Sequence, residues 1–294
     1  MLLLGFAESS HQARAIARQA GIDYAEIQVH HFPDGESRLT LPTSLPSQVA
    51  IYRSLDQPNS KLLELFLLSS ALREAGVEEL ILIAPYLCYM RQDRAFAEGE
   101  VVSQKHLGKL LAAHFDGLIT VDPHLHRTPQ LALAVPVKHA IALHATEPMA
   151  EFLQQMPDTP VLLGPDEESR QWVEEIAHRQ GLEFAVANKL RHGDRKVEIR
   201  LPELDYQDRH IILVDDVVSS GHTMAEAARG VLQAGASTVD CLMTHALFAE
   251  GAETLLQEAG IERIYSTDAI PHHSNCLSLA PLLAQTLRPL LRDS

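Results

Sequence analysis

The fold is decided by the stretch His210-Ile-Ile-Leu-Val-Asp-Asp-Val-Val-Ser-Ser-Gly-His-Thr223. Its four apolar residues, 211–214, predict a strand that is buried on both faces of a parallel sheet. A small polar turn, 219–223, then leads into a predicted helix that starts near Met224. A strand, a tight loop and a helix N-terminus form an anion site, because backbone N–H groups converge there and the helix dipole adds partial positive charge.

Two adjacent carboxylates, Asp215 and Asp216, stand where this strand is expected to end. Carboxylates in that place suit sugar hydroxyls or a hydrated Mg²⁺ ion. The alternative is an ordinary strand–turn–helix corner with two solvated aspartates, but the Ser-Ser-Gly-X-Thr that follows favours a cradle for ribose 5-phosphate. The predicted cradle consists of Asp215, Asp216, Ser219, Ser220, Gly221, His222 and Thr223.

Length and charge limit the classes of function. The chain of 294 residues has room for two domains that each bury a core. It carries 24 Lys and Arg against 39 Asp and Glu, a formal net charge of −15. This balance argues against nucleic acid as a partner, since no basic stripe is present to release counterions. A phosphate site in so acidic a chain must depend on local amides, a few Lys or Arg side chains, and metal ions.

The cysteines and the apolar runs indicate the compartment. Cys88, Cys241 and Cys276 are widely spaced and form no C-x-x-C pair, which argues against a disulfide framework or a zinc site. The first residues lack the basic segment of a signal peptide, and no apolar run is long enough to cross a membrane. We therefore expect a cytoplasmic protein that does not associate with membranes.

Strands and helices alternate along the chain with a spacing typical of α/β folds. The order strand, loop, helix, strand occurs in both halves, and the helices end at Ala75-Gly76 and Ala234-Gly235. We predict an α/β fold of two similar domains, 1–146 and 147–294, each a mainly parallel sheet flanked by helices. The predicted strands include 1–6, 49–55, 80–85, 118–122, 161–166, 184–189, 239–244 and 263–267, and the predicted helices include 10–19, 61–75, 103–114, 168–180 and 279–291.

Binding residues in such sheets gather at the carboxyl ends of the strands, and two charged segments follow predicted strands in the first half. In the turn Phe32-Pro-Asp-Gly-Glu36, Phe32 could stack on a base while Asp34 and Glu36 accept hydrogen bonds. In Arg91-Gln-Asp-Arg94, the guanidinium groups could pair with phosphates. The alternatives are a surface turn with charged side chains and a solvated helix start.

Further candidates follow strands elsewhere in the chain. His124 suits a metal ligand or a phosphate contact, although a surface histidine fits the local sequence equally well. Asp166 lies between a strand and a helix, where a plain N-cap is the alternative. Lys189 and Arg191 alternate on a basic loop that could close on transferring phosphates and stabilise developing charge. A solvated basic loop is the alternative for this pair.

Taken in order, these motifs resemble those of the ribose-phosphate diphosphokinases, or phosphoribosyl diphosphate (PRPP) synthases. The resemblance covers the chain from about residue 28 to 275 and is specific as a series, whereas the cradle alone would indicate only the wider phosphoribosyltransferase superfamily. It rests on Phe32-Pro-Asp-Gly-Glu36, on the segments 58–65 and 85–94, on Val121-Asp-Pro-His124, on 164–166 and 189–191, on the cradle, and on Thr244-His245.

The resemblance implies two domains of the type I phosphoribosyltransferase fold and an enzyme that moves the diphosphoryl group of ATP to C1 of ribose 5-phosphate, with Mg²⁺. His124 and Asp166 are the implied metal positions, and Lys189 and Arg191 the implied catalytic pair. In this family a neighbouring subunit usually supplies the turn Phe32–Glu36, so the resemblance implies a homo-oligomer, a dimer or a multiple of dimers. The implied ATP-binding residues are Phe32, Asp34, Gly35, Glu36, Arg91, Gln92 and His124.

Three places depart from the family pattern. Ser219 stands where the synthases usually carry Asp, the acidic residues 167–168 replace a glycine-containing turn, and Pro123 stands where leucine is common. Two other functions stay open, a phosphoribosyltransferase of nucleotide salvage and a non-catalytic regulatory subunit of the same fold. The duplicated domain and the segment Arg91–Arg94 argue against the first, and the retained catalytic pair argues against the second.

Overall fold

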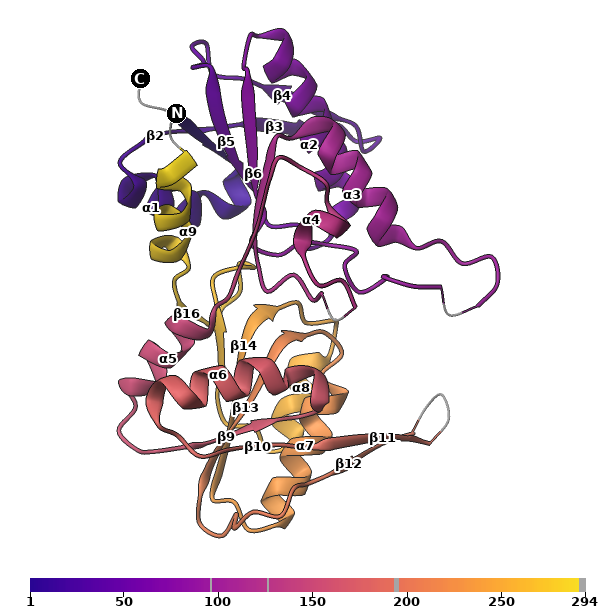
Figure 1. Cartoon of the computed structure of the whole chain (residues 1–294), viewed down its shortest axis with the longest axis vertical. Coiled ribbons are helices and arrows are strands. Elements are labelled where there is room, and N and C mark those ends of the chain that lie inside the picture. Colours follow the sequence, from indigo (N-terminus) through magenta and orange to yellow (C-terminus); the bar gives the residue numbers. More distant parts are fainter. Residues whose placement is uncertain (96, 126, 193–195, 291–294) are drawn as a thin grey trace. The chain divides into compact units, whose positions relative to one another are not determined.

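The chain forms two compact units, each an α/β sheet with helices (Figure 1). The computed structural model describes residues 1–95, 97–125, 127–192 and 196–290, with the backbone alone given for 189–192 and 196–198. The first unit runs from Met1 to Leu143 and includes the C-terminal segment from Leu279, and the second runs from His144 to Ser278. None of the helices in the described ranges is long and apolar enough to cross a membrane.

The first unit is built on a parallel sheet with the strand order β2-β1-β5-β6-β7-β8. Every residue of β1, β5, β6 and β7 is buried, as expected for apolar runs covered by helices on both faces. The chain order reverses between β1 and β5, so the carboxyl ends of these two strands form the topological switch point. The strands are β1 (Leu2–Gly5), β2 (Asp23–Glu26), β5 (Gln48–Tyr52), β6 (Glu79–Ile83), β7 (Gly117–Val121) and β8 (His139–Leu143).

The C-terminal helix α9 (Ala280–Leu287) packs with the first unit, against α1 (Ser10–Ala20). Next to it, the Arg288 guanidinium donates to the Gln19 carbonyl at 2.6 Å. The predicted domain 147–294 contains this segment, whereas the structure places it in the other unit, because α9 buries its apolar side there. The remaining helices of the unit are η1 (Ala7–Ser9), α2 (Pro58–Glu74), α3 (Ser103–His114), α4 (Leu131–Ala134) and η3 (Arg288–Leu290).

The second unit repeats this topology with the strand order β10-β9-β13-β14-β15-β16, again all parallel. Its switch point lies between β9 and β13. Both units thus confirm the predicted α/β class and its parallel sheets. The strands are β9 (Val161–Gly164), β10 (Phe184–Val186), β13 (His210–Val218), β14 (Thr238–Ala246), β15 (Ile264–Thr267) and β16 (Asn275–Leu277), and the helices are α5 (Thr146–Gln154), η2 (Glu167–Ser169), α6 (Arg170–Gln180), α7 (His222–Gln233) and α8 (Ala252–Glu258).

Each unit also carries an antiparallel hairpin. In the first unit β3 (Gln28–His31) pairs with β4 (Ser37–Thr40). In the second, β11 (Asn188–His192) pairs with β12 (Lys196–Arg200), and this hairpin extends away from its sheet (Figure 1). The predicted strand 184–189 is therefore wrong at its end, since one residue separates β10 from β11.

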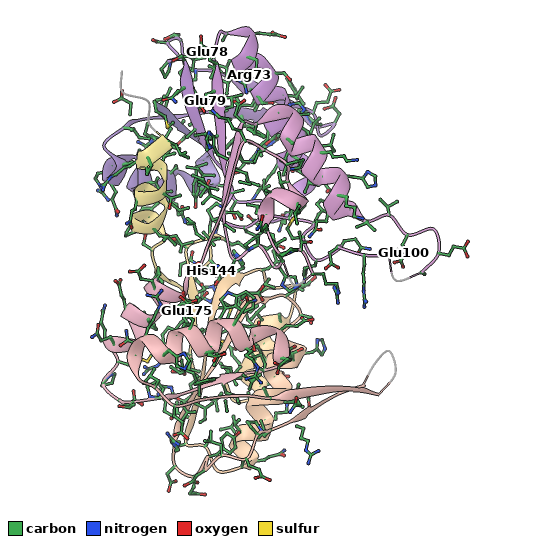
Figure 2. The ribbon with its side chains drawn as sticks, in the orientation of Figure 1. Arg73, Glu78, Glu79, Glu100, His144 and Glu175 are labelled. Atoms are coloured by element: carbon green, nitrogen blue, oxygen red, sulfur yellow. The ribbon has the colours of Figure 1, made fainter. Side chains whose placement is uncertain are left out.

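The amino ends of the first sheet are joined by charged groups that serve the fold. Arg73, labelled with Glu78 in Figure 2, donates to the Glu78 carbonyl at 2.5 Å and pairs with Asp116 at 2.6 Å. Burial acts to raise the pKa of Asp116, but the Leu80 N–H and the Arg73 guanidinium hold that pKa below its usual value. The charged groups at the amino ends of the strands therefore pair with one another. The candidate site residues lie at the other end, at the carboxyl ends of the strands.

Candidate active site

The carboxyl end of β13 brings two acidic side chains of the predicted cradle together. Asp216 is buried and Asp215 is partly buried. The Asp216 N–H donates to Asp215 Oδ1 at 3.0 Å, and the Val217 N–H donates to Asp216 Oδ1 at 2.8 Å. The prediction that the strand ends at these two residues is wrong, because β13 continues to Val218.

Asp166, at the carboxyl end of the neighbouring strand β9, adds a third carboxylate. Burial raises the pKa of Asp215 well above its usual value, and the charges of Asp216 and Asp166 raise it further. Asp166, one of the two predicted metal positions, therefore lies near Asp215 and Asp216 of the predicted cradle, at the switch point of the second sheet. Three carboxylates this close repel one another, and a divalent cation with oxygen ligands would remove the repulsion. These residues thus fit the Mg²⁺ that the sequence implied.

Asp166 also caps the turn that follows β9. Its Oδ1 accepts from the Glu168 N–H at 3.1 Å, so the N-cap alternative is correct. Asp166 also belongs to the group Asp166, Asp215 and Asp216, which we call the acidic cluster. Gly164 allows this turn to approach the strand, because a Cβ there would overlap with Ser169 Oγ. The extra charge of Glu167 is directed to solvent and to Arg170, whose Nη2 lies 2.9 Å from Glu167 Oε2.

The loop 219–221 leads directly into α7, as the anion site requires. Gly221 has a φ of 76°, and a Cβ there would lie 3.3 Å from Leu256 Cδ2 and 3.4 Å from the Ala252 carbonyl oxygen. Only glycine takes this backbone conformation without strain. The Ser219 carbonyl accepts from the Ala249 N–H at 3.0 Å, which fixes the start of the loop. The N-terminus of α7 thus follows Asp215 and Asp216 in the chain after one short loop, as the predicted cradle requires.

The predicted catalytic pair is placed by its backbone alone. Lys189 and Arg191 lie on β11, opposite Ile199 and Val197 of β12. Two residues apart on one strand, they belong to the same face of the hairpin. Their side chains lie outside the described part of the structure, so their contacts with the cradle stay a prediction.

The turn Phe32–Glu36 of the first unit is an exposed hairpin tip. The Gly35 N–H donates to the Phe32 carbonyl at 2.9 Å, and the Phe32 N–H donates to the Glu36 carbonyl at 2.8 Å. The Phe32 side chain is 39% exposed, with the His30 ring edge-on at 4.7 Å between centroids. Single exposed aromatic side chains are common, so the exposure of Phe32 leaves room for a base but does not show that one binds.

The segment 91–94 also lies at the surface. Arg91 and Arg94 are exposed, whereas Asp93 holds Arg127 at 2.9 Å and 3.0 Å through its two carboxylate oxygens. Gln92 donates to the Arg94 carbonyl at 3.4 Å. The loop is thus anchored through its acidic residue, and phosphate binding by its arginines stays a prediction.

His124 follows β7 on a strained piece of backbone. Its φ is 52°, and that of Asp122 is 39°, so two non-glycine residues on either side of Pro123 adopt left-handed conformations. Such conformations cost about 1–3 kcal/mol each and cluster at functional sites. His124 belongs to the first unit and Asp166 to the second. Their joint metal binding stays a prediction.

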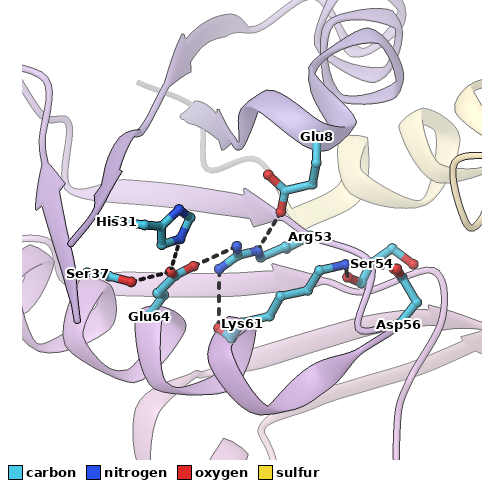
Figure 3. Close-up of polar contacts among 8 residues, drawn as sticks. All are labelled: Glu8, His31, Ser37, Arg53, Ser54, Asp56, Lys61 and Glu64. Carbon is cyan, nitrogen blue, oxygen red and sulfur yellow. Dashed lines mark hydrogen bonds and ion pairs between the residues drawn. The ribbon is translucent and has the colours of Figure 1, made fainter. Parts of the chain in front are cut away.

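The sequence did not single out the charged residues at the switch point of the first sheet (Figure 3). Arg53, directly after β5, pairs with Glu64 at 2.7 Å and with Glu8 at 2.9 Å, and its guanidinium lies 3.8 Å above the centre of the Phe6 ring. Ser37 and His31 also bond the Glu64 carboxylate, at 2.6 Å and 2.9 Å. We call this group the Arg53 cluster.

The Arg53 cluster occupies the place that the acidic cluster has in the second unit. Leu4 pairs with Ile51 where β1 meets β5, and Leu163 pairs with Leu213 where β9 meets β13. Arg53 lies two residues after Ile51, and Asp215 lies two residues after Leu213. A cation thus stands in the first unit where an anion stands in the second. Only a comparison of the two halves residue by residue would have found this signal.

Comparisons with known proteins were made for the whole chain. Residues 1–114 match the family model described as the N-terminal domain of ribose phosphate pyrophosphokinase, and residues 138–277 match the phosphoribosyl transferase domain. A ribose-phosphate pyrophosphokinase of Methanopyrus kandleri is 35% identical over 293 residues, which cover 99% of each chain. One from Pyrococcus furiosus is 30% identical over 287 residues, which cover 98% of this chain and 100% of the relative.

A solved structure shares the fold over nearly the full length. The phosphoribosylpyrophosphate synthetase from Mycobacterium smegmatis superposes with a TM-score of 0.82 at 22% identity, covering 98% of both chains. Together with the match to the phosphoribosyl transferase domain, this likeness confirms the fold that the sequence predicted.

Proposed function

Because the chain belongs to the ribose-phosphate pyrophosphokinase family, we propose that it transfers the diphosphoryl group of ATP to the C1 hydroxyl of ribose 5-phosphate, giving phosphoribosyl diphosphate and AMP. The observation that carries the proposal is the match to curated relatives of this name over 99% of the chain, both units included. The acidic cluster and the start of α7 also support the proposal. A sugar phosphate needs carboxylates for its hydroxyl groups and N–H groups for its phosphate, and this segment of the chain carries both.

We assign ribose 5-phosphate to the second unit. The N–H groups at the loop 219–223 and the start of α7 would hold the phosphate, as helix N-termini do in general. Asp215 and Asp216 would accept hydrogen bonds from the ribose hydroxyls. The exposed Ser220 and His222 and the partly buried Ser219 and Thr223 line the same loop and complete the cradle.

The same assignment gives ATP to residues of the first unit. Phe32 would stack on adenine, with Asp34, Gly35 and Glu36 around its edge. Arg91 and Gln92 would bind the phosphates, and His124 would contact them or their metal ion. The exposure of Phe32 and Arg91 supports this assignment, because both side chains are open to a ligand.

Diphosphoryl transfer depends on position and on neutralised charge. The attacking hydroxyl and the transferred phosphorus must be held in line, which a cradle for one substrate and a separate seat for the other can achieve. Lys189 and Arg191 would stabilise charge on the transferred group and on the departing AMP. Asp166, with His124 and the neighbouring carboxylates, would hold Mg²⁺, which supplies charge neutralisation to the phosphates when bound.

The proposal is tested by incubating the purified protein with ATP, ribose 5-phosphate and Mg²⁺ and measuring AMP. Lys189→Ala should lower kcat by about 10²–10³-fold, the typical effect of removing one group that stabilises transition-state charge. Lys138→Ala is the matched control, because it also removes one lysine, but one that lies at the amino ends of the strands of the first sheet, away from the candidate site residues. Lys138 precedes β8 and pairs with Glu79 at 3.6 Å. Full activity of Lys189→Ala would refute the assigned role of the pair.

The same assay separates the alternatives. A salvage phosphoribosyltransferase would release no AMP from these substrates but would consume phosphoribosyl diphosphate and a base. A regulatory subunit would do neither. A cytoplasmic location and a dimer, or a multiple of dimers, belong to the same proposal, and light scattering of active and dilute samples tests the oligomer. An active monomer would contradict the idea that the turn Phe32–Glu36 completes the site of a neighbouring subunit.

A further inference from the structure

A second group of potential metal ligands lies in the second unit, apart from the acidic cluster. It consists of Glu253 in the first turn of α8 and of His272 and His273 in the segment between β15 and β16. Each residue offers a ligand atom, and these atoms all lie within 4.8 Å of one another. Among the residues that the structure describes, this is the group in which histidine and carboxylate ligands converge in this way.

The distances within the group suit a small divalent cation. His273 Nε2 lies 3.0 Å from Glu253 Oε1, and His272 Nε2 lies 3.5 Å from Glu253 Oε2. Ligand atoms around a tetrahedral zinc ion lie roughly 3.4 Å apart, as bond lengths of about 2.1 Å require. The two distances to Glu253 bracket this value, and all three ligand atoms lie within 4.8 Å of one another, so side-chain rearrangement can bring them around one ion. A fourth position stays open on the side of His273, which is 74% exposed.

A second layer of hydrogen bonds holds His272 in place. Its Nδ1 lies 2.7 Å from Ser274 Oγ, which lies 2.7 Å from Ser266 Oγ. Asn275 closes the same turn, since its Oδ1 accepts from the His272 N–H at 2.8 Å and its Nδ2 donates to the Thr267 carbonyl at 2.6 Å. Metal-binding histidines almost always use their second ring nitrogen in this way. The Ser274 N–H also donates to His272 Nδ1 at 3.3 Å, so binding of an ion at Nε2 requires the other tautomer, in which Nδ1–H donates to Ser274 Oγ.

We propose that Glu253, His272 and His273 form a binding site for a transition-metal ion of the zinc class. Two imidazoles and one carboxylate select zinc, cobalt or nickel over magnesium, which prefers oxygen ligands and keeps its water. The site contains no cysteine, so the spacing of the cysteines gave no sign of it. It is independent of the proposed activity, since none of its residues belongs to the cradle or to the catalytic pair.

The ion would join two segments that lie far apart in sequence. α8 packs behind the cradle loop, where the Ala252 carbonyl and Leu256 approach Gly221. Glu253 follows Ala252 directly, and His272 contacts the Phe248 ring just before α8, at 5.1 Å between centroids. An ion at this place would therefore fix the start of α8 to the segment just before β16 and stiffen the support of Gly221.

The experiment uses the full-length protein, freed of any affinity tag and of metals, titrated with Co²⁺ in excess Mg²⁺. Mg²⁺ occupies oxygen-rich sites, and the visible absorption of Co²⁺ reports nitrogen ligands. We expect one equivalent of Co²⁺ to give this absorption and one equivalent of Zn²⁺ to remove it. The variant Ser274→Ala, which leaves all three ligands in place, should weaken binding about 10–100-fold.

The variant His272→Ala/His273→Ala should lose the absorption, whereas His11→Ala/His178→Ala, which removes two exposed histidines elsewhere, should keep it. Glu253→Gln gives a second test at a helix surface if the first variant does not fold. Trp172 fluorescence verifies the fold of the second unit in each variant, because it is the one tryptophan of the chain and is buried in α6. An unchanged affinity for Co²⁺ in a folded His272→Ala/His273→Ala or Glu253→Gln protein would overturn the proposal.

Discussion

Replacement of Arg53 by Met should destabilise the first unit strongly. Arg53 and Glu64 have side chains that are 5% and 2% exposed, so their ion pair is buried at both ends. Arg53→Met keeps much of the volume but leaves the Glu64 carboxylate in the interior without its cation. Breaking a buried pair in this way costs about 3–5 kcal/mol, against about 0–1 kcal/mol for a surface pair. We expect the lower end, about 3 kcal/mol, because Ser37 and His31 still bond Glu64.

Urea unfolding followed by far-ultraviolet circular dichroism measures this loss. Hydrogen exchange of peptides from α2 and β5 shows whether it belongs to the first unit. Trp172 lies in the second unit, so its fluorescence follows the other half of the molecule. If the units unfold separately, the fluorescence transition of Arg53→Met should stay in place while exchange in α2 and β5 becomes faster.

Two further variants identify the cause. Glu8→Gln removes the 40% exposed partner of Arg53 and should cost less than about 1 kcal/mol. Arg53→Met/Glu64→Leu removes both buried charges and should recover most of the stability, because apolar side chains of similar volume often replace a buried pair without loss. A loss below 1 kcal/mol for Arg53→Met, or a double variant as unstable as the sum of the single variants, would refute the reasoning.

Three other outcomes are expected. Burial acts to raise the pKa of Glu64, but Ser37, Arg53 and His31 hold this pKa below its usual value. The ionised carboxylate therefore stabilises the fold above the unfolded pKa, and this contribution is lost as the pH falls through the folded pKa. The free energy of unfolding, measured with urea at decreasing pH, should show a drop that the Glu64→Gln variant lacks. Asp215→Asn should raise the melting temperature in the absence of Mg²⁺, because it removes like-charge repulsion, and should weaken ribose 5-phosphate binding; a lower melting temperature in a folded Asp215→Asn protein would contradict this. Gly221→Ala should cost about 1–3 kcal/mol through its positive φ and should raise the KM for ribose 5-phosphate more than it lowers kcat, which steady-state kinetics at saturating ATP can measure.

The sequence predicted the buried strands well because an apolar run in an α/β chain has few other structures open to it. The helix predicted at 103–114 is α3 with the same ends, and the apolar run 211–214 lies within β13. The edge strand β2 was missed, since Asp23–Glu26 contains no apolar run and needs only one neighbour. The last helix was assigned to the wrong unit, because adjacency in sequence does not determine which surface an amphipathic helix covers.

The candidate site was predictable to the extent that its residues share one strand or one loop. Asp215, Asp216 and Gly221 belong to a single strand–loop–helix segment, and the structure brings Asp166 to the same strand ends. The Arg53 cluster was not predictable in this way, because Glu8 stands 45 positions before Arg53 on another strand end. The group Glu253, His272 and His273 also joins segments that are distant in sequence, so the spacing of these residues did not indicate a metal site.

The Arg53 cluster gives the two halves of the molecule different relations to their surroundings. In the first unit, the counter-ion is part of the chain, so its effective concentration is constant whatever the medium contains. In the second, like charges stand at the matching place, and the Mg²⁺ that we propose to bind there would come from solution. On the proposed assignment, the duplicated fold joins a self-sufficient copy to one that is completed by what it binds, and a shortage of divalent cations would loosen the second unit while leaving the first unchanged.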